Sequence, residues 1–511
     1  MEPVTAPRRG PRMNRYRLMT ASWVPVVIVT AIGGAVRFVG LDRQSFWIDE
    51  VVTVGLLARS LPDMLGALPD AESTPPLYYI LAWLWSRMSG LDEVGLRALS
   101  ALFGTLTIPV CYGAARTLIG HRAGVIVAAL AAVSPLLVWY SQEARAYSLF
   151  AFLGALSFLT FARALEEPSP RRLAFWSGAS SLMIVTHYFG IFLLAAEALV
   201  LLHQRRSRAT WAATGAIVGV GLAILPLAVY QVLFSSSRWI RLVDLAARFE
   251  ETVRQLLVPG PPSLWAGAGV AENVARTWWP LGIVLLVCAL ATLAAIGSRK
   301  ERRGALVALG VGLAAAGIPL LMSLAAVLVT DGRGDVFLYR NVVVAWLPLA
   351  VVIGAALGAR RAGLGGILAA SALVAWSFAV VVQDASDPER QRDDWRLVTA
   401  ALDGPAGQVV LLSPSWEIAA LEHFVPGLRE LGERRIATRQ IDLLVRRHVP
   451  SYSPAVDTLR PPPPGFRRVE TRTLQNWLLT RYRSRRPVYL DAVDLRVAPE
   501  DASRVPLVRA R

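Results

Sequence analysis

The chain has 511 residues, of which 54% are hydrophobic and only 18% are charged, and its mean hydropathy is +0.46. Because soluble domains carry about 25% charged residues, this composition excludes a cytosolic enzyme, a disordered regulator and a disulfide-stapled secreted module. It predicts a polytopic membrane protein. The formal net charge of +16 indicates nucleic acid or a membrane surface as a partner. Cys111 and Cys288 lie in apolar segments, so neither a disulfide framework nor a cysteine metal site is predicted.

Apolar windows long enough to cross a bilayer recur along the first 383 residues. A crossing helix needs roughly 20 apolar residues. Eleven windows approach this length: 19–40, 94–116, 122–140, 145–164, 171–187, 188–204, 209–233, 279–297, 304–329, 339–358 and 362–383. A twelfth segment, 75–90, is short, opens with two prolines and contains Arg87. We predict that it lies along the outer face or is partly re-entrant.

The arginine clusters predict the orientation of these helices. Arginines precede the first window, and the following loops are also basic: 116–122, 163–172, 203–208, 298–304 and 359–361. Since cytoplasmic loops carry an excess of Lys and Arg, eleven crossings place the N-terminus and these loops in the cytoplasm. The tail then lies outside the plasma membrane, which argues against nucleic acid as a partner.

The sequence predicts two domains, a transmembrane domain over 1–383 and an extracytoplasmic tail over 384–511. The tail alternates short helical and strand-like runs, so we expect a small α/β domain. Residues 408–414 (QVVLLSP) are typical of a buried strand, and 416–424 (WEIAALEHF) of a helix. Four consecutive prolines at 461–464 predict a break that divides this domain in two.

Two adjacent carboxylates, Asp49 and Glu50, follow the first window by about nine residues. Trp47 favours a position at headgroup depth, because aromatic residues are enriched at membrane interfaces. Carboxylates beside the apolar slab are costly to desolvate unless they have a function. An enzyme that moves a sugar from a lipid carrier needs a carboxylate at this depth, to take the proton of the acceptor hydroxyl. On this pair alone, a solvated loop is the simpler interpretation.

Further motifs follow the acidic pair in order along the membrane part. They are Arg37, Thr74-Pro75-Pro76-Leu77, Arg97, the run from Ser141 to Tyr147 (SQEARAY), Thr186-His187-Tyr188, Arg340 before the span containing Pro348, and Asp394-Trp395-Arg396. Together they resemble the polyprenyl-phosphate-sugar-dependent glycosyltransferases of the GT-C type. The nearest resemblance is to the bacterial relatives of protein O-mannosyltransferases and aminoarabinose transferases (glycosyltransferase family 39, RgtA/B/C/D-like). Thr74 stands where this family often has histidine.

This resemblance implies a membrane enzyme with two juxtamembrane helices between its first and second spans. The implied donor is a polyprenyl-phosphate sugar, with mannose or a related sugar, and the implied acceptor is a lipid, a glycan or a protein. Asp49 would be the general base and Glu50 would orient or bind the acceptor, with inversion at the sugar. The scheme requires no cofactor, although Glu143 leaves room for a divalent metal.

The candidate substrate-binding residues lie near the outer ends of the windows: Arg37, Arg97, Glu143, Arg145, Tyr147, His187 and Arg340. Arg340 would hold the carrier phosphate or snorkel to a lipid headgroup. Glu143 and Arg145 would either bind the acceptor or cap a helix. Arg37 and Arg97 would either bind the carrier or pair with the acidic residues. A lone histidine such as His187 is more often structural, and the histidines show no zinc spacing.

Two rival interpretations remain open from the sequence. A transporter or flippase of lipid-linked glycans would carry ionisable residues near the bilayer midplane. Glu197 is the main charge of that kind, whereas the other suggestive charges cluster at the outer ends of the windows. That distribution favours chemistry at the interface. The second rival is a catalytically inactive relative that only binds polyprenyl lipid.

Overall fold

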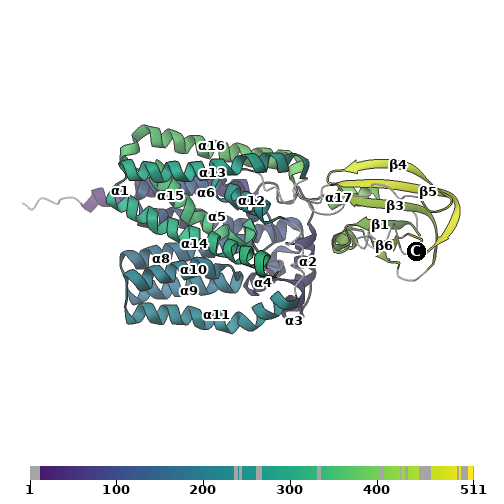
Figure 1. Cartoon of the computed structure of the whole chain (residues 1–511), viewed down its shortest axis with the longest axis horizontal. Helices are drawn as coiled ribbons and strands as arrows, with labels where there is room; N and C mark the ends of the chain where they lie inside the picture. The colour runs from purple at the N-terminus through teal and green to yellow at the C-terminus, as the bar shows by residue number, and fades with distance from the viewer. Residues whose placement is uncertain are drawn as a thin grey trace, which may run out of the picture.

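The computed structural model describes most of the chain, and most of the described residues are helical. The described residues are 12–234, 240, 244–260, 268–330, 335–402, 404, 407–425, 427–431, 435–447, 462–491, 494–495 and 505–509. Figure 1 shows a bundle of long helices, with the sheet domain beyond one of its ends. The expected fold class, a polytopic α-helical protein with a small C-terminal α/β domain, is confirmed.

Each of the eleven predicted windows contains a helix of the bundle. These are α1 (Arg12–Phe38), α5 (Glu93–Leu118), α6 (His121–Val133) with α7 (Pro135–Ser141), α8 (Tyr147–Glu166), α9 (Pro170–Thr186), α10 (Gly190–Gln204), α11 (Arg208–Phe234), α13 (Ala268–Ile296), α14 (Arg299–Thr330), the 3-10 segment η2 (Tyr339–Ala345) with α15 (Trp346–Leu357), and α16 (Gly363–Ser386). The amphipathic helix α12 (Leu245–Leu257) packs against α13, and a 3-10 turn, η3 (Arg360–Ala362), precedes α16.

Seven helices among the described residues are long and apolar enough to cross a membrane. The number rises to eight if α6 and α7, which meet at a bend of 53°, form one span. Pro135 explains the bend, because proline lacks the N–H that would continue the helix. The count of eleven crossings stays a prediction.

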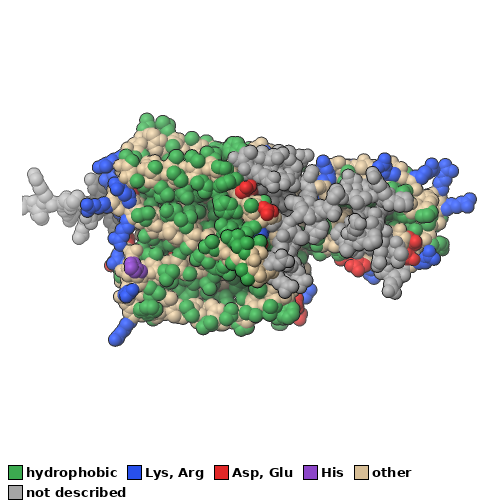
Figure 2. Space-filling model, in the orientation of Figure 1, with side chains coloured by type: hydrophobic (Ala, Val, Ile, Leu, Met, Phe, Trp, Pro, Cys, Tyr) green, Lys and Arg blue, Asp and Glu red, His purple; other side chains and the backbone are tan. Residues whose placement is uncertain are grey.

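The two ends of the bundle differ in charge. Figure 2 shows apolar flanks and a band of Lys and Arg at the end away from the sheet domain. Three of the predicted basic loops meet in the structure, because Arg116, Arg163 and Lys300 line one pocket. Such an asymmetry is the pattern that the positive-inside rule describes.

The opposite end carries three short helices instead of the two that the resemblance implied. They are α2 (Ile48–Leu57), α3 (Leu61–Ala71) and α4 (Leu77–Ser89). The Ser60 hydroxyl accepts the Asp63 N–H and Pro62 lies at the helix start, so a new helix begins after α2. α4 is about 20 Å long, too short for a hydrocarbon core of about 30 Å. This fits the prediction that residues 75–90 do not cross.

The C-terminal domain is a six-stranded sheet with the order β2-β6-β1-β3-β5-β4. Its elements are the 3-10 turn η4 (Pro388–Arg390), α17 (Trp395–Ala401), β1 (Val409–Ser413), the 3-10 turn η5 (Ser415–Glu417), α18 (Ile418–Phe424), β2 (Leu428–Glu430), β3 (Ile436–Arg446), β4 (Phe466–Leu474), β5 (Trp477–Leu490) and β6 (Val505–Arg509). β1 runs parallel to β3, and the other neighbours are antiparallel. The predicted strand at 408–414 and helix at 416–424 are confirmed by β1 and α18.

The predicted break at the four prolines is wrong. β3 precedes them and β5 follows them, yet these two strands pair from Ile436 with Leu490 to Arg446 with Trp477. Pro461 lies outside the described residues, and the other three prolines precede β4. Proline cannot donate to a ladder of hydrogen bonds, so the three described prolines lie in the connection before β4 and do not separate two domains.

Candidate active site

Asp49 lies in the first turn of α2, at the end of the bundle that faces the C-terminal domain. Its carboxylate is 29% exposed and lies 3.6 Å from Nη1 of Arg340, measured to Oδ2. Arg145 Nη1 donates to the backbone carbonyl of Asp49 at 3.2 Å. The two candidate residues Asp49 and Arg340, which are far apart in the sequence, therefore meet in the structure.

Glu50 points in another direction from Asp49, since consecutive helix residues are about 100° apart. It has no exposed surface and forms a two-bond ion pair with Arg97, at 2.8 Å to Oε1 and 2.6 Å to Oε2. The Ala144 N–H donates to Oε1 at 2.8 Å. Burial alone would raise the pKa of Glu50, but Arg97 and these hydrogen bonds hold it below its ordinary value. Glu50 is a buried, ionised anchor.

Arg145 and Glu72 form a second buried ion pair, which fixes the backbone behind Asp49. Arg145 makes two hydrogen bonds to the Glu72 carboxylate, one of them from Nη2 at 2.8 Å. It also donates to Thr53 Oγ1 at 3.2 Å. Glu72 ends α3 and was not among the predicted site residues. Its sequence signal was weak, because a carboxylate after a short helix is common on solvated surfaces.

Aromatic rings line the site beside Arg340. The guanidinium carbon of Arg340 lies 5.6 Å from the Tyr147 ring centre, and Tyr140 packs 4.8 Å from Tyr147. His187 lies behind them, stacked on Phe150 at 4.4 Å. The Phe189 N–H donates to His187 Nδ1 at 3.3 Å. The ring thus packs as an aromatic residue, which is the structural alternative considered for it.

Arg37 is buried in the bundle and bonded to the backbone. Its guanidinium donates to the carbonyls of Gly33, Ala131 and Ala132 at 2.7 to 2.9 Å, and to Ser141 Oγ at 3.1 Å. The last carbonyls of a helix lack helical partners, and α6 ends at the bend before Pro135. Arg37 supplies the missing donors, so the structure does not bring it to Asp49 as a phosphate-binding group.

Arg97 is likewise fully hydrogen-bonded within the protein. Its five N–H groups all have acceptors, which are the two Glu50 oxygens and the carbonyls of Leu41, Gln44 and Ser45. Of the alternatives considered for Arg97, the structure contains the pairing with an acidic residue. Arg97 has no N–H group left to bind the carrier phosphate.

Glu143 connects the site to the C-terminal domain. Its Oε2 accepts a hydrogen bond from Arg392 at 2.8 Å, and the Arg392 guanidinium lies 4.1 Å from the Trp139 ring centre. Burial raises the pKa of Glu143 in spite of Arg392, and the nearby Glu50 and Asp49 raise it further. Arg392 was missed by the sequence analysis, although it lies just before the Asp394-Trp395-Arg396 motif.

That motif docks the C-terminal domain onto the loop between α1 and α2. The Trp395 N–H donates to Ser45 Oγ at 2.8 Å, and Arg396 donates to the carbonyls of Asp42 and Arg43 at 3.0 and 2.9 Å. Thr74, which replaces the family histidine, is buried with its hydroxyl 3.4 Å from Tyr79 Oη. It therefore offers no open group to a substrate.

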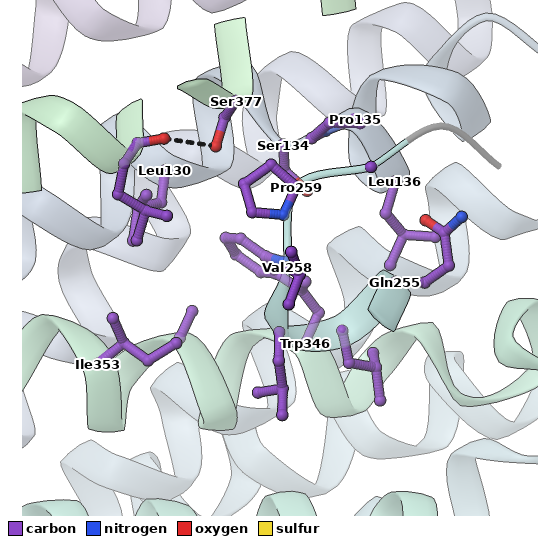
Figure 3. A pocket seen from close by; sticks show the side chains of 15 residues that line it. Leu130, Ser134, Pro135, Leu136, Gln255, Val258, Pro259, Trp346, Ile353 and Ser377 are labelled. Atoms are coloured by element: carbon purple, nitrogen blue, oxygen red, sulfur yellow. Dashed lines mark hydrogen bonds between the residues drawn. The ribbon is translucent and has the colours of Figure 1, made fainter. Parts of the chain in front are cut away.

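A small cavity of about 40 Å³ lies where the bend between α6 and α7 meets the end of α12. Figure 3 shows it lined by Ser134, Pro259, Trp346 and Ser377, among others. On this measure one water needs about 10–15 Å³, so the space holds only a few waters and is too small for a sugar. It is a packing cavity and contains none of the predicted site residues.

Among the described residues, no group of three or more His, Cys, Asp or Glu side chains is placed to hold a metal ion. Glu143, the residue considered for a divalent metal, is instead paired with Arg392. That no cofactor is required, with a divalent metal possible, stays a prediction, which addition of a chelator to a transfer assay tests.

Residues 73–232 match the model of the dolichyl-phosphate-mannose-protein mannosyltransferase family. The resemblance to this family is confirmed. The matched stretch runs from Ser73 into α11 and includes Glu143, Arg145, Tyr147 and His187.

Two solved structures are similar to this chain. The archaeal oligosaccharyltransferase AglB from Archaeoglobus fulgidus, in complex with an inhibitory peptide and a dolichol-phosphate, is 13% identical with a TM-score of 0.45; the alignment covers 80% of this chain and 64% of that one. ArnT from Cupriavidus metallidurans bound to undecaprenyl phosphate is 14% identical with a TM-score of 0.37, covering 90% and 98%. This chain thus spans less than two thirds of the archaeal enzyme. The comparison with curated proteins finds no match.

Proposed function

We propose that this protein transfers a sugar, mannose or a related one, from a polyprenyl-phosphate carrier to an acceptor on the outer face of the plasma membrane. The acceptor is a lipid, a glycan or a protein of the cell envelope. The N-terminus is cytoplasmic in this proposal and the C-terminal domain is extracytoplasmic. Membrane lipids surround the bundle, and no nucleic acid is involved.

The observation that carries the proposal is the difference in exposure among four neighbouring carboxylates. The side chains are 29%, 0%, 4% and 2% exposed for Asp49, Glu50, Glu72 and Glu143 respectively. Each of the three buried ones is paired with an arginine at 2.8 Å or less. Asp49 alone is accessible and held only loosely, at 3.6 Å from Arg340. A carboxylate in that state is free to accept a proton.

The proposed reaction uses Asp49 and Arg340 as a pair. Asp49 takes the proton of the acceptor hydroxyl while the acceptor oxygen attacks the sugar carbon that bears the phosphate. The bond between that carbon and the phosphate oxygen breaks, and Arg340 stabilises the negative charge left on the polyprenyl phosphate. The direct displacement inverts the sugar. Glu50, with no exposed surface, positions the start of α2 and is not assigned acceptor contact.

The test is consumption of radiolabelled polyprenyl-phosphate sugars by the full-length protein in liposomes. Water acts as the acceptor, so release of free sugar counts as turnover. We expect one donor of the panel to be consumed, and that donor identifies the sugar. If no donor is consumed even with envelope lipids and glycans added as acceptors, the enzyme proposal is wrong, and donor binding without turnover would indicate the inactive lipid-binding alternative.

Replacing Arg340 by Gln is expected to lower kcat by about a hundred-fold to a thousand-fold, the usual effect of removing one donor that stabilises transition-state charge. Arg340→Lys should recover only part of the activity, because an ammonium cannot form the paired hydrogen bonds of a guanidinium. Initial rates at several donor concentrations measure this. Arg59→Gln removes an exposed arginine from the same end of the bundle and is expected to leave kcat unchanged. Equal losses in the two variants would contradict the role of Arg340.

A further inference from the structure

A cavity of about 690 Å³ opens on the flank of the bundle, away from Asp49. It lies between α1 and α16, and α6, which packs against both of these helices, forms its floor. The cavity begins at the end of the bundle where Figure 2 shows the band of Lys and Arg. We call this cavity the flank groove.

The floor of the flank groove is a single stripe along α6. Arg122, Val125, Ile126, Ala129 and Val133 line the groove, and their spacing of three, four, seven and eleven residues places them on one helix face. Arg122 is exposed and the next three are only half-buried. The stripe is thus left partly uncovered between two helices that pack on either side of it.

The walls of the flank groove are almost entirely apolar. α16 contributes Ile367, Val374 and Phe378, and α1 contributes Pro25 and Ile32. The polar lining side chains are His121, Arg122 and Ser371, and the first two lie together at the start of α6. The groove therefore fits an amphipathic molecule whose polar group lies at the basic end.

The positive charge at the start of α6 favours a ligand with an anionic group. Arg122 forms no hydrogen bond or ion pair with any other residue that the structure describes. Arg361 is exposed two residues beyond Ala359, which also lines the groove. No carboxylate contributes to the lining. His121 already has a partner, with its Nδ1 3.0 Å from Tyr112 Oη, so Arg122 is the group open to a phosphate.

We propose that the flank groove binds an anionic phospholipid, with one acyl chain along α6 and the phosphate at Arg122. The floor from His121 to Val133 is about 18 Å long, close to the thickness of one leaflet of a hydrocarbon core about 30 Å thick. With the arginine-rich end in the cytoplasm, the lipid belongs to the inner leaflet. The proposal does not depend on the sugar-transfer reaction.

The test is native mass spectrometry of the full-length protein with palmitoyl-oleoyl phosphatidylglycerol or the matching phosphatidylcholine. We expect one tightly retained phosphatidylglycerol and weaker retention of phosphatidylcholine. Ser371→Phe should abolish the tight adduct, because it fills the groove from an exposed position that tolerates a larger side chain. Arg122→Gln should weaken phosphatidylglycerol binding about five-fold, the effect typical of one basic residue at an anionic lipid surface.

Two matched controls separate a built site from general attraction to the surface. Ala372→Phe adds the same ring at the next residue of α16, which is exposed and does not line the groove. Arg303→Gln removes one positive charge at the same end of the bundle, where Arg303 bonds to Gln204. Both should leave the tight adduct unchanged. The proposal is wrong if Ser371→Phe retains the adduct, if Ala372→Phe loses it equally, or if Arg303→Gln weakens it as much as Arg122→Gln.

Discussion

Replacing Asp49 by Asn is expected to lower sugar transfer by about a hundred-fold to ten-thousand-fold, the contribution typical of a positioned general base. The amide keeps the size of the side chain and its place beside Arg340, but it cannot accept the proton of the acceptor. The thermal midpoint of unfolding should change little, because Asp49 is partly exposed and its contact with Arg340 is long at 3.6 Å. Donor turnover and thermal unfolding of the same preparation measure both effects.

Asp42 supplies the matched control for Asp49. It is exposed in the loop that leads into α2, and its backbone carbonyl, not its side chain, accepts the bond from Arg396. Asp42→Asn therefore removes one carboxylate charge near the site and should preserve turnover. Turnover by Asp49→Asn at the wild-type rate would keep the enzyme but refute the assignment of its base.

The helices of the bundle could be predicted because their signal is local. Each window contains its own apolar residues, and the arginines between windows stand next to the helix ends they flank. The number of crossings is harder to predict, because α10 and the segment Trp23–Phe38 of α1 are short apolar helices. The bend at Pro135 divides another window into two helices. Hydropathy alone does not show how such pieces cross a bilayer.

The site could be predicted only in part, because its partners are distant in the sequence. Asp49 and Glu50 are adjacent carboxylates that the sequence alone does not distinguish. Their environments differ because Glu50 pairs with Arg97, 47 residues further on. Glu143 meets Arg392 across 249 residues. The position of Arg37 at a helix end suggested phosphate binding. In the structure it instead donates to backbone carbonyls that the bend after α6 leaves without helical partners. Only the packing of the helices shows which charged side chains remain accessible to a substrate.

Removing Arg97 is expected to be the most destabilising single change near the site. Glu50 is fully buried, and Arg97 supplies two of its hydrogen bonds. Arg97→Met would leave an unpaired buried carboxylate and three carbonyls without a donor, at a cost of about 3 to 5 kcal/mol. Arg97→Lys should recover little, because three donors cannot replace five. Thermal unfolding in detergent measures the loss.

The double variant Glu50→Met with Arg97→Met distinguishes the buried charge from the lost packing. Because both charges disappear together, its destabilisation should be smaller than the sum of the two single effects by about 0.5 to 3 kcal/mol. The exposed pair Arg172–Glu167, with side chains 36% and 74% exposed, is the control, and Arg172→Met should cost less than about 1 kcal/mol. If Arg97→Met costs no more than this control, the pair does not anchor α2. The difference in exposure between Asp49 and Glu50 would then need an explanation other than the ion pair of Glu50 with Arg97.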